Sequence, residues 1–216
     1  MNDTIKITSA SRDFDQAGHL SYVAIGDMCH AMLGSQNDRL IEHYMQKMYR
    51  KKKNRFSYEL TLQATINDKV AGLMTCMPYR DLERSLVSTV IQIALLKHIF
   101  VFPHILNYYQ SILSLIRMQE GEDDEYHVSM LSVSSEFQRR GVGQALLEEA
   151  EHKAKAAGFN KISLTVNQIN YKANALYQKL GYEKVGEAKA SMITLNRMRK
   201  HLTSVSYTHL RAHETR

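Results

Sequence analysis

The sequence predicts a single α/β domain, a mixed β-sheet with helices on both of its faces. Two observations predict this class: short runs of alternating apolar residues recur along the chain, and segments with apolar residues at helical spacing separate them. The order is strand, two helices, two strands, an apolar insertion, then strand, helix, strand, helix and two strands. With 216 residues, 44% of them apolar, the chain is long enough for one core. We assign residues 1–204 to this domain.

The N-terminal part of the chain carries one strand and two helices. Ile5–Thr8 alternates as a strand does, and Phe14–Leu33 has apolar residues at helical spacing, so we expect one helix that ends at Gly34. A second helix is expected from Asp38 and closes with the basic cluster Arg50–Arg55. This cluster can complement the helix dipole, or it can face an acidic partner, a phosphate group or nucleic acid. We favour the first explanation.

A β-hairpin follows the basic cluster. Leu60–Ile66 and Lys69–Met77 have the composition of strands, and Asn67 and Asp68 between them are typical of a tight turn. These segments are the predicted second and third strands.

Residues 79–124 are predicted to form an insertion between the third and fourth strands. Asp81–Phe102 and Ile105–Met118 are apolar at helical spacing, and Pro103 separates them, so we expect a helical hairpin. Its most apolar run contains Gln92, Lys97 and His98 and falls short of the about 20 apolar residues of a membrane span. We therefore expect a lid over a binding site or a homodimer surface, and no membrane span.

A glycine-containing loop joins the fourth strand to a helix. The strand is predicted at Tyr126–Val133, the loop at Gln138–Gly143, and the helix from about Gly141 to Gly158. Glycines at 141 and 143 allow a tight turn, so free N–H groups at the helix N-terminus can converge on an anion. The pattern predicts a phosphate-binding cradle made of backbone, although the same pattern also occurs in ordinary tight turns.

A second strand and helix follow the cradle. Ile162–Val166 is predicted as a strand that leads through Asn170 into a helix, which carries Leu176 and Tyr177 and ends at Gly181 and Tyr182. Two final strands are expected at Tyr182–Ala188 and Met192–Arg197.

These two blocks resemble the GNAT superfamily of acetyl-CoA-dependent N-acetyltransferases. The family's pyrophosphate signature, Q/R-x-x-G-x-G/A, is matched by Gln138, Gly141 and Gly143, and its downstream Asn, Tyr and Gly-aromatic positions by Asn170, Tyr177, Gly181 and Tyr182. The resemblance implies a mostly antiparallel sheet of six to seven strands. It also implies acetyl-CoA as co-substrate and acetyl transfer to a primary amine by direct attack in a ternary complex. The acceptor stays open between a small-molecule amine and a protein amine.

The resemblance also assigns roles to residues. The predicted coenzyme-binding residues are Leu131, Ser132, Val133, Gln138, Arg139, Arg140, Gly141, Val142, Gly143, Gln144, Ala145 and Asn170. The backbone of Leu131–Val133 is expected to hold the pantetheine arm and to polarise the thioester carbonyl. Tyr177 is the expected general acid for the leaving thiolate, although a helical tyrosine can also be a core residue. Asn170 either caps its helix or binds the coenzyme.

The general base is where the chain departs from the family. In the branch that acetylates protein lysines, a glutamate lies eleven residues before the motif glutamine, and this chain has His127 there. A histidine can accept an ammonium proton directly or through water, so His127 is the candidate base, with Glu125 and Glu59 as alternatives. No histidine forms an H-E-x-x-H motif or pairs with a cysteine at ligand spacing, and we predict no metal. The alternative function is a non-catalytic acyl-CoA-binding or regulatory module.

Composition adds weaker expectations. The two cysteines, Cys29 and Cys76, are far apart, and no apolar signal segment follows Met1, so we expect a reduced, cytoplasmic setting. The formal net charge of +6 suits an anionic ligand such as coenzyme A, and nucleic acid or an acidic protein equally; nucleic-acid binding is not favoured. Residues 205–216 lack periodicity and read like a translated sequencing adapter, so we predict that they are a non-native tail.

Overall fold

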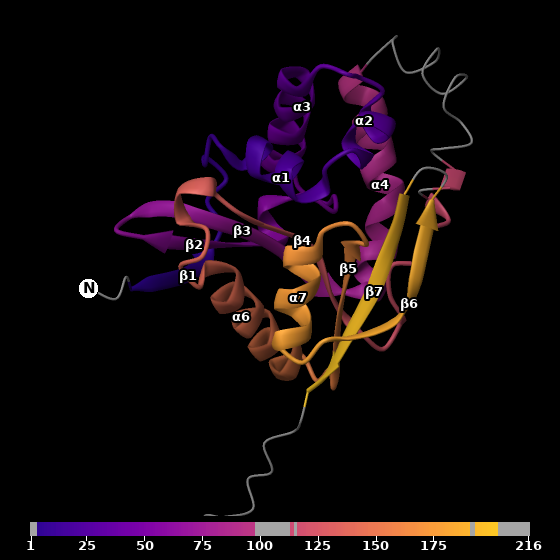
Figure 1. Cartoon of the computed structure of the whole chain (residues 1–216). Helices are drawn as coiled ribbons and strands as arrows, with labels where there is room; N and C mark the ends of the chain where they lie inside the picture. Colours follow the sequence, from indigo (N-terminus) through magenta and orange to yellow (C-terminus); the bar gives the residue numbers. More distant parts are fainter. Residues whose placement is uncertain (1–3, 98–112, 115, 191–192, 203–216) are drawn as a thin grey trace, which may run out of the picture.

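The computed structural model describes residues 4–97, 113–114, 116–190 and 193–202. Within these ranges the strands form a seven-stranded sheet in the order β1-β2-β3-β4-β5-β7-β6, and every neighbouring pair is antiparallel except β4 and β5 (Figure 1). The strands are β1 Ile5–Ser9, β2 Thr61–Ile66, β3 Lys69–Pro78, β4 Tyr126–Val133, β5 Lys161–Asn167, β6 Glu183–Ala190 and β7 Ile193–His201. The predicted mixed, mostly antiparallel sheet is confirmed.

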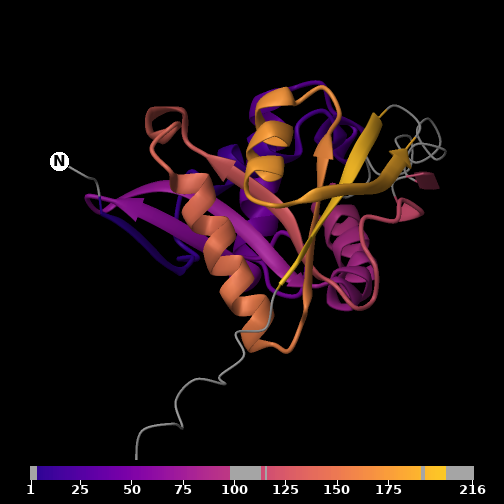
Figure 2. The ribbon, with the colours of Figure 1, turned by 60° about the horizontal axis from the view of Figure 1, so that its bottom comes forward.

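Helices cover both faces of the sheet. The α-helices are α1 Ala17–Ile25, α2 Met28–Leu33, α3 Asp38–Arg50, α4 Tyr79–Lys97, α6 Val142–Ala156 and α7 Tyr171–Lys179. Helices α1 to α4 lie on one side, and α6 and α7 lie on the other (Figures 1 and 2). The main core lies between α6 and the sheet, where Leu146, Leu147, Ala150 and Ala154 of α6 are fully buried. The apolar stripe of this helix therefore fixes the position of the loop that precedes it.

The first helical segment differs from the sequence prediction. Phe14–Leu33 was expected to be one helix, but the chain forms α1 and α2, which are separated at Gly26. Gly26 has φ 64° and ψ −140°, a conformation that L-residues rarely adopt, and its N–H bonds to the Tyr22 carbonyl. The apolar residues keep their helical spacing across Gly26, so the sequence pattern does not indicate that the helix is broken there.

The basic cluster also differs from the prediction. Helix α3 ends at Arg50, and Lys51 is already extended, so residues 51–55 form a loop instead of a last helical turn. Within this loop the carbonyl of Lys53 accepts a hydrogen bond from Ser88 of α4. Arg50 pairs with Asp15 at 2.6 Å and Lys52 with Glu59 at 3.0 Å. The cluster thus ties α3 to its neighbours.

The predicted β2–β3 hairpin is confirmed, with Asn67 and Asp68 both at positive φ in the turn. Helix α4 corresponds to the first helix of the predicted insertion, as far as Lys97. Most of the predicted second helix and the whole of residues 205–216 lie outside the described residues. None of the helices that the structure describes is long and apolar enough to cross a membrane.

Strands β4 and β5 are paired only at their first residues. The parallel register joins Tyr126 to Ile162, His127 to Ser163 and Val128 to Leu164, and no later pair follows in the described strands. Beyond this point β4 stays paired with β3 and β5 with β7, so the two strands diverge, as Figure 2 shows. This divergence opens the sheet at its centre, next to the glycine loop.

Candidate functional site

The glycine loop presents free backbone N–H groups at the start of α6. Arg139 and Gly141 have left-handed backbones, with φ 62° and 83°, and Gly141 is the N-cap without a capping side chain. The first hydrogen bond of the helix runs from the Ala145 N–H to the Gly141 carbonyl at 3.0 Å. Helix geometry therefore leaves the N–H groups of Val142, Gly143 and Gln144 without intrahelical acceptors. Together with the helix dipole, these groups have the arrangement that the predicted anion cradle requires.

Two glycines near the loop serve different purposes. A Cβ on Gly72 of β3 would lie 2.7 Å from the Ser132 carbonyl oxygen, so glycine is needed there for close packing of β3 and β4. A Cβ on Gly143 would meet no atom closer than 3.7 Å, which is ordinary contact. The fold itself can therefore accept alanine at 143. The atoms nearest to this Cβ would belong to Val133, Leu176 and Leu131, which line the cavity described next.

A cavity of about 1040 Å³ begins at this loop and continues through the gap between β4 and β5. It brings together most of the residues predicted for coenzyme binding, namely Leu131, Ser132, Val133, Gln138, Arg139, Gly141, Val142, Gly143, Gln144 and Asn170. Arg140 and Ala145 do not line it; the Arg140 guanidinium lies 5.2 Å from the centre of the Phe137 ring. Beyond the coenzyme residues the cavity extends to α1, α2 and α4.

Tyr177 lies in the wall of the same cavity, on α7. Its side chain is buried, with 8% of the residue exposed, and burial raises the pKa of its phenol to about 12. The phenol therefore carries its proton at neutral pH and is available as a proton donor. Asn170 caps α7, since its side-chain oxygen accepts a hydrogen bond of 3.2 Å from the Ala173 N–H. The cap fixes the start of the helix that carries Tyr177.

Comparison with known proteins agrees with this geometry. The sequence model of a family described as an acetyltransferase (GNAT) domain matches residues 99–202. The chain is 42% identical over 57 residues to N-acetyltransferase family 8 member 3 of Rattus norvegicus, which covers 26% of this chain and 25% of that protein. It is 39% identical over 64 residues to the uncharacterized protein YdhI of Bacillus subtilis, covering 30% of this chain and 38% of that protein.

Solved structures extend the similarity to the whole fold. The crystal structure of an N-acetyltransferase from Staphylococcus aureus Mu50 superimposes with a TM-score of 0.69 at 18% identity, covering 90% of this chain and 99% of that one. A second crystal structure, described as an acetyltransferase, gives a TM-score of 0.68 at 22% identity, covering 92% and 100%. Residues 99–202 thus match the sequence of a GNAT acetyltransferase domain, and the described fold is that of solved acetyltransferases. The curated relatives named above match it over only a quarter to two fifths of their own length.

Within this GNAT domain, His127 lies behind the cavity. It is fully buried on β4 and is not among the cavity-lining residues. Its Nδ1 lies 3.0 Å from Ser163 Oγ, and its Nε2 has no hydrogen-bond partner among the described residues and lies 3.8 Å from Glu120 Oε2. The two alternative bases do not line the cavity either. Glu59 pairs with Lys52, and the fully buried Glu125 pairs with Arg199.

Two of the charged side chains that line the cavity, Arg55 and Glu120, form a pair that the sequence did not indicate. Arg55 binds both carboxylate oxygens of Glu120, with Nη1–Oε1 at 3.0 Å and Nη2–Oε2 at 3.1 Å, and Arg55 Nη2 also donates to Ser129 Oγ at 3.0 Å. Burial by itself would raise the pKa of Glu120, but the charge of Arg55 and the nearby His127 outweigh it and lower the pKa to about 2. The carboxylate is therefore ionised at neutral pH.

Sequence reasoning missed this pair for a simple reason. Arg55 belongs to a basic run and Glu120 to an acidic run, and both runs have the composition of solvated surface. The two residues are 65 positions apart, and no local pattern links them. Only the packing of α4 against β3 and β4 brings the loop after α3 next to the residues that precede β4.

Proposed function

We propose that this chain is an N-acyltransferase that transfers the acetyl group of acetyl-CoA to a primary amine in a ternary complex. The observation that carries the proposal is the continuous cavity, which begins at a backbone phosphate cradle and contains Tyr177 in its wall. A coenzyme held by the cradle can therefore extend its thioester toward a proton donor. The match of residues 99–202 to the acetyltransferase (GNAT) domain supports the same reaction class.

In this scheme the coenzyme is held mainly by backbone. The pyrophosphate lies on the N–H groups of Val142, Gly143 and Gln144, and the pantetheine arm enters the gap between β4 and β5. Backbone groups of Leu131–Val133 that β5 leaves unpaired face this gap and polarise the thioester carbonyl. Removing one such donor costs about 2.7–4 kcal/mol of transition-state stabilisation in measured enzymes.

Acetyl transfer then proceeds without an acyl-enzyme. The neutral amine nitrogen bonds to the carbonyl carbon, the carbon–sulfur bond breaks, and its electron pair goes to the sulfur, which takes the proton of the Tyr177 phenol. The nitrogen then releases one proton to water to give the neutral amide, and the phenol regains a proton from water. Neither cysteine lines the cavity, and burial raises the pKa of Cys29 to about 12 and that of Cys76 to about 11. Because both stay protonated thiols, neither is an activated nucleophile, and direct attack is favoured.

For the ammonium proton we retain His127 as the residue to test. Glu120 lines the cavity and His127 lies 3.8 Å behind it, so a proton reaches His127 by way of Glu120 or a water molecule. A carboxylate with a pKa of about 2 is a weak base by itself. In this arrangement Glu120 accepts a hydrogen bond from the amine and orients it, and His127 takes up the proton.

Calorimetry of the full chain with acetyl-CoA, coenzyme A and a longer acyl-CoA tests the proposal, followed by thiol release with a panel of amines in the same preparation. Binding of acetyl-CoA together with amine-dependent thiol release is the expected result. Binding without release by any amine would support a non-catalytic acyl-CoA-binding module instead. An absence of binding would contradict the cradle and the proposed reaction with it.

A further inference from the structure

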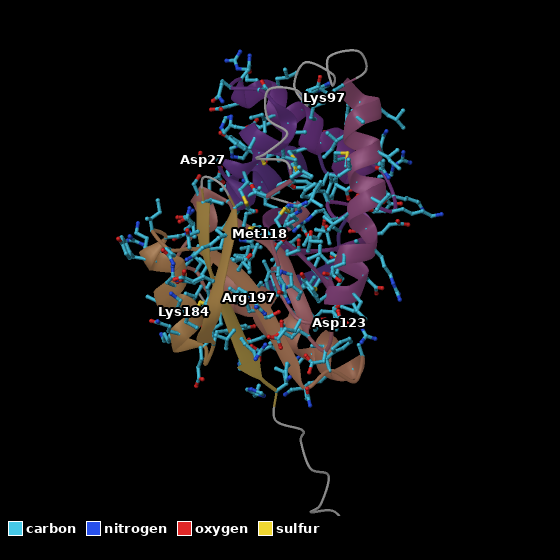
Figure 3. All side chains as sticks on the ribbon, turned by 90° about the vertical axis from the view of Figure 1, so that its right-hand side faces the viewer. Asp27, Lys97, Met118, Asp123, Lys184 and Arg197 are labelled. Carbon is cyan, nitrogen blue, oxygen red and sulfur yellow. The ribbon has the colours of Figure 1, made fainter. Side chains whose placement is uncertain are left out.

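The cavity has a second part, away from the coenzyme loop, which we call the acceptor lobe. Its walls come from the α1–α2 region, from the loop after α3 and from α4, and they are largely apolar: Met28, Met32, Phe56, Leu86, Val90 and Ile93. Figure 3 looks onto this side of the molecule and shows Met118, another lining residue, between α4 and β7. The lobe is therefore better suited to bind the apolar part of a ligand than a hydrated, charged group.

Helix α4 contributes one of its faces to the lobe. Leu86, Val90 and Ile93 are spaced by four and three positions, so they lie on the same side of the helix. The neighbouring position Val87 points away from the lobe and is 69% exposed. The helix thus provides both a lobe residue, Val90, and a chemically identical control residue outside the lobe.

The charges in the lobe balance one another. Arg55 occupies both oxygens of Glu120, and the Lys97 ammonium donates to the Leu33 carbonyl. Asp27, an exposed residue at the start of α2, is the remaining lining carboxylate that the structure describes on this side (Figure 3). A polyamine or an aminoglycoside carries several charged ammonium groups, which would lose their hydration on entering the lobe. Among the residues that the structure describes, the lobe does not offer enough unpaired carboxylates to compensate for that loss with ion pairs.

We propose, resting on the function proposed above, that the acceptor is a small monoamine carried on an apolar body that fills the acceptor lobe. Apolar surroundings disfavour the ammonium form of a bound amine and favour the neutral form, which is the nucleophile. The lobe itself thus assists deprotonation, in a chain that has histidine where related enzymes have a glutamate. Binding strength should rise with the apolar area that the amine buries.

The first test measures binding without turnover. Straight-chain alkylamines from butylamine to octylamine carry the same charge and differ only in apolar length, and spermidine provides the polycation. Calorimetry of each amine with the CoA-saturated protein should show affinity rising by about fourfold per methylene until the lobe is full, with spermidine binding more weakly than octylamine. An affinity independent of chain length, or stronger binding of spermidine, would overturn the proposal.

The second test compares Val90→Asp with Val87→Asp. Val90 is 43% exposed, so the fold should accept a carboxylate at either position, and thermal unfolding checks this. Val90→Asp should flatten the dependence on chain length and improve spermidine binding, while Val87→Asp should behave as the wild type. Equal behaviour of the two variants would count against the lobe. If Val90→Asp fails to fold, Val90→Thr keeps the shape and should reduce octylamine affinity.

The same series separates this proposal from the reaction on which it rests. Measured by thiol release with acetyl-CoA, kcat/KM should follow the order of the binding affinities. Chain-length-dependent binding without thiol release from any amine would contradict the proposed reaction and leave the lobe assignment standing. Thiol release that is fastest with spermidine would leave the reaction standing and contradict the lobe assignment.

Discussion

The proposed coenzyme half and the proposed acceptor half of the cavity are built in different ways. The coenzyme half consists of consecutive segments, β4, the glycine loop, α6, β5 and α7, and it presents mostly backbone groups. The acceptor half consists of side chains from α1, α2, α4, the loop after α3 and the residues before β4. Backbone binding depends on glycine positions and helix starts, so it can be shared among proteins with different side chains. Acceptor choice depends on side chains that come from distant parts of the sequence.

The largest effect is expected from Tyr177, where the two halves meet. Tyr177→Phe removes the phenolic proton donor and keeps the ring, so kcat should fall by about 10²- to 10⁴-fold while the Kd for acetyl-CoA stays unchanged. Calorimetry and thiol release measure the two quantities. Tyr171→Phe, on the same helix and 77% exposed, is the matched control and should change neither. An unchanged kcat in Tyr177→Phe would remove the general-acid assignment.

The next largest effect is expected from Glu120, whose replacement should reduce folding stability without changing coenzyme binding. Glu120→Gln leaves the Arg55 guanidinium without its counter-charge, so the free energy of unfolding at pH 7 should fall by about 3 kcal/mol, measured by urea denaturation. The Kd for acetyl-CoA should not change. Glu59→Gln, which breaks the more exposed pair with Lys52, should cost less than about 1 kcal/mol.

The pH dependence of this difference has a defined sign. The pKa of Glu120 is lowered from 4.5 to about 2 in the folded protein, so its ionisation stabilises the fold above about pH 4.5. That contribution is lost as the pH falls from 4.5 toward 2. The gap between the wild type and Glu120→Gln should therefore shrink over this range. A constant gap would show that the loss comes from packing and not from the charge.

A smaller effect is expected at the cradle, this time without loss of stability. Gly143→Ala adds a methyl group that the fold accepts, among side chains that line the cavity, so it should weaken acetyl-CoA binding by about 10- to 100-fold. The free energy of unfolding should stay the same or rise, because alanine favours a helix over glycine. Gly186→Ala, where a Cβ meets nothing within 4 Å, is the control and should leave affinity intact. Unchanged affinity in Gly143→Ala would contradict the cradle.

The smallest effect is expected from Asn170, and it tests whether this residue only caps its helix or also binds the coenzyme. Asn170 and Asn37 each cap a helix through a side-chain oxygen 3.2 Å from a backbone nitrogen. Replacing either with alanine should reduce the free energy of unfolding by about 1 kcal/mol. Only Asn170→Ala should also weaken acetyl-CoA binding, by about fivefold, since only Asn170 lines the cavity. Equal coenzyme affinity in the two variants would restrict Asn170 to the capping role.

The sequence predicted the strands, turn and helix around the glycine loop well because the signals there are local. The β4 strand has the predicted bounds, α6 begins next to Gly141, and the β2–β3 turn lies at Asn67 and Asp68. Elsewhere local signals were incomplete. The break at Gly26 is hidden within continuous apolar periodicity, and α3 ends at Arg50 because the following loop bonds to α4 through Ser88. Both differences depend on contacts or angles that periodicity does not report.

The sequence by itself determined the order of strands and helices, the glycine loop at Gln138–Gly143 that opens a helix, and the position of Tyr177 on a helix after the fifth strand. Each depends on residues within one or two turns of each other, where glycine placement and apolar spacing dictate the local conformation. Only the tertiary structure decided that His127 lies behind the cavity and that Arg55 and Glu120 form its charged pair. Burial and ion pairing depend on how segments that are distant in the sequence pack together, and such contacts produce no periodic pattern in the sequence.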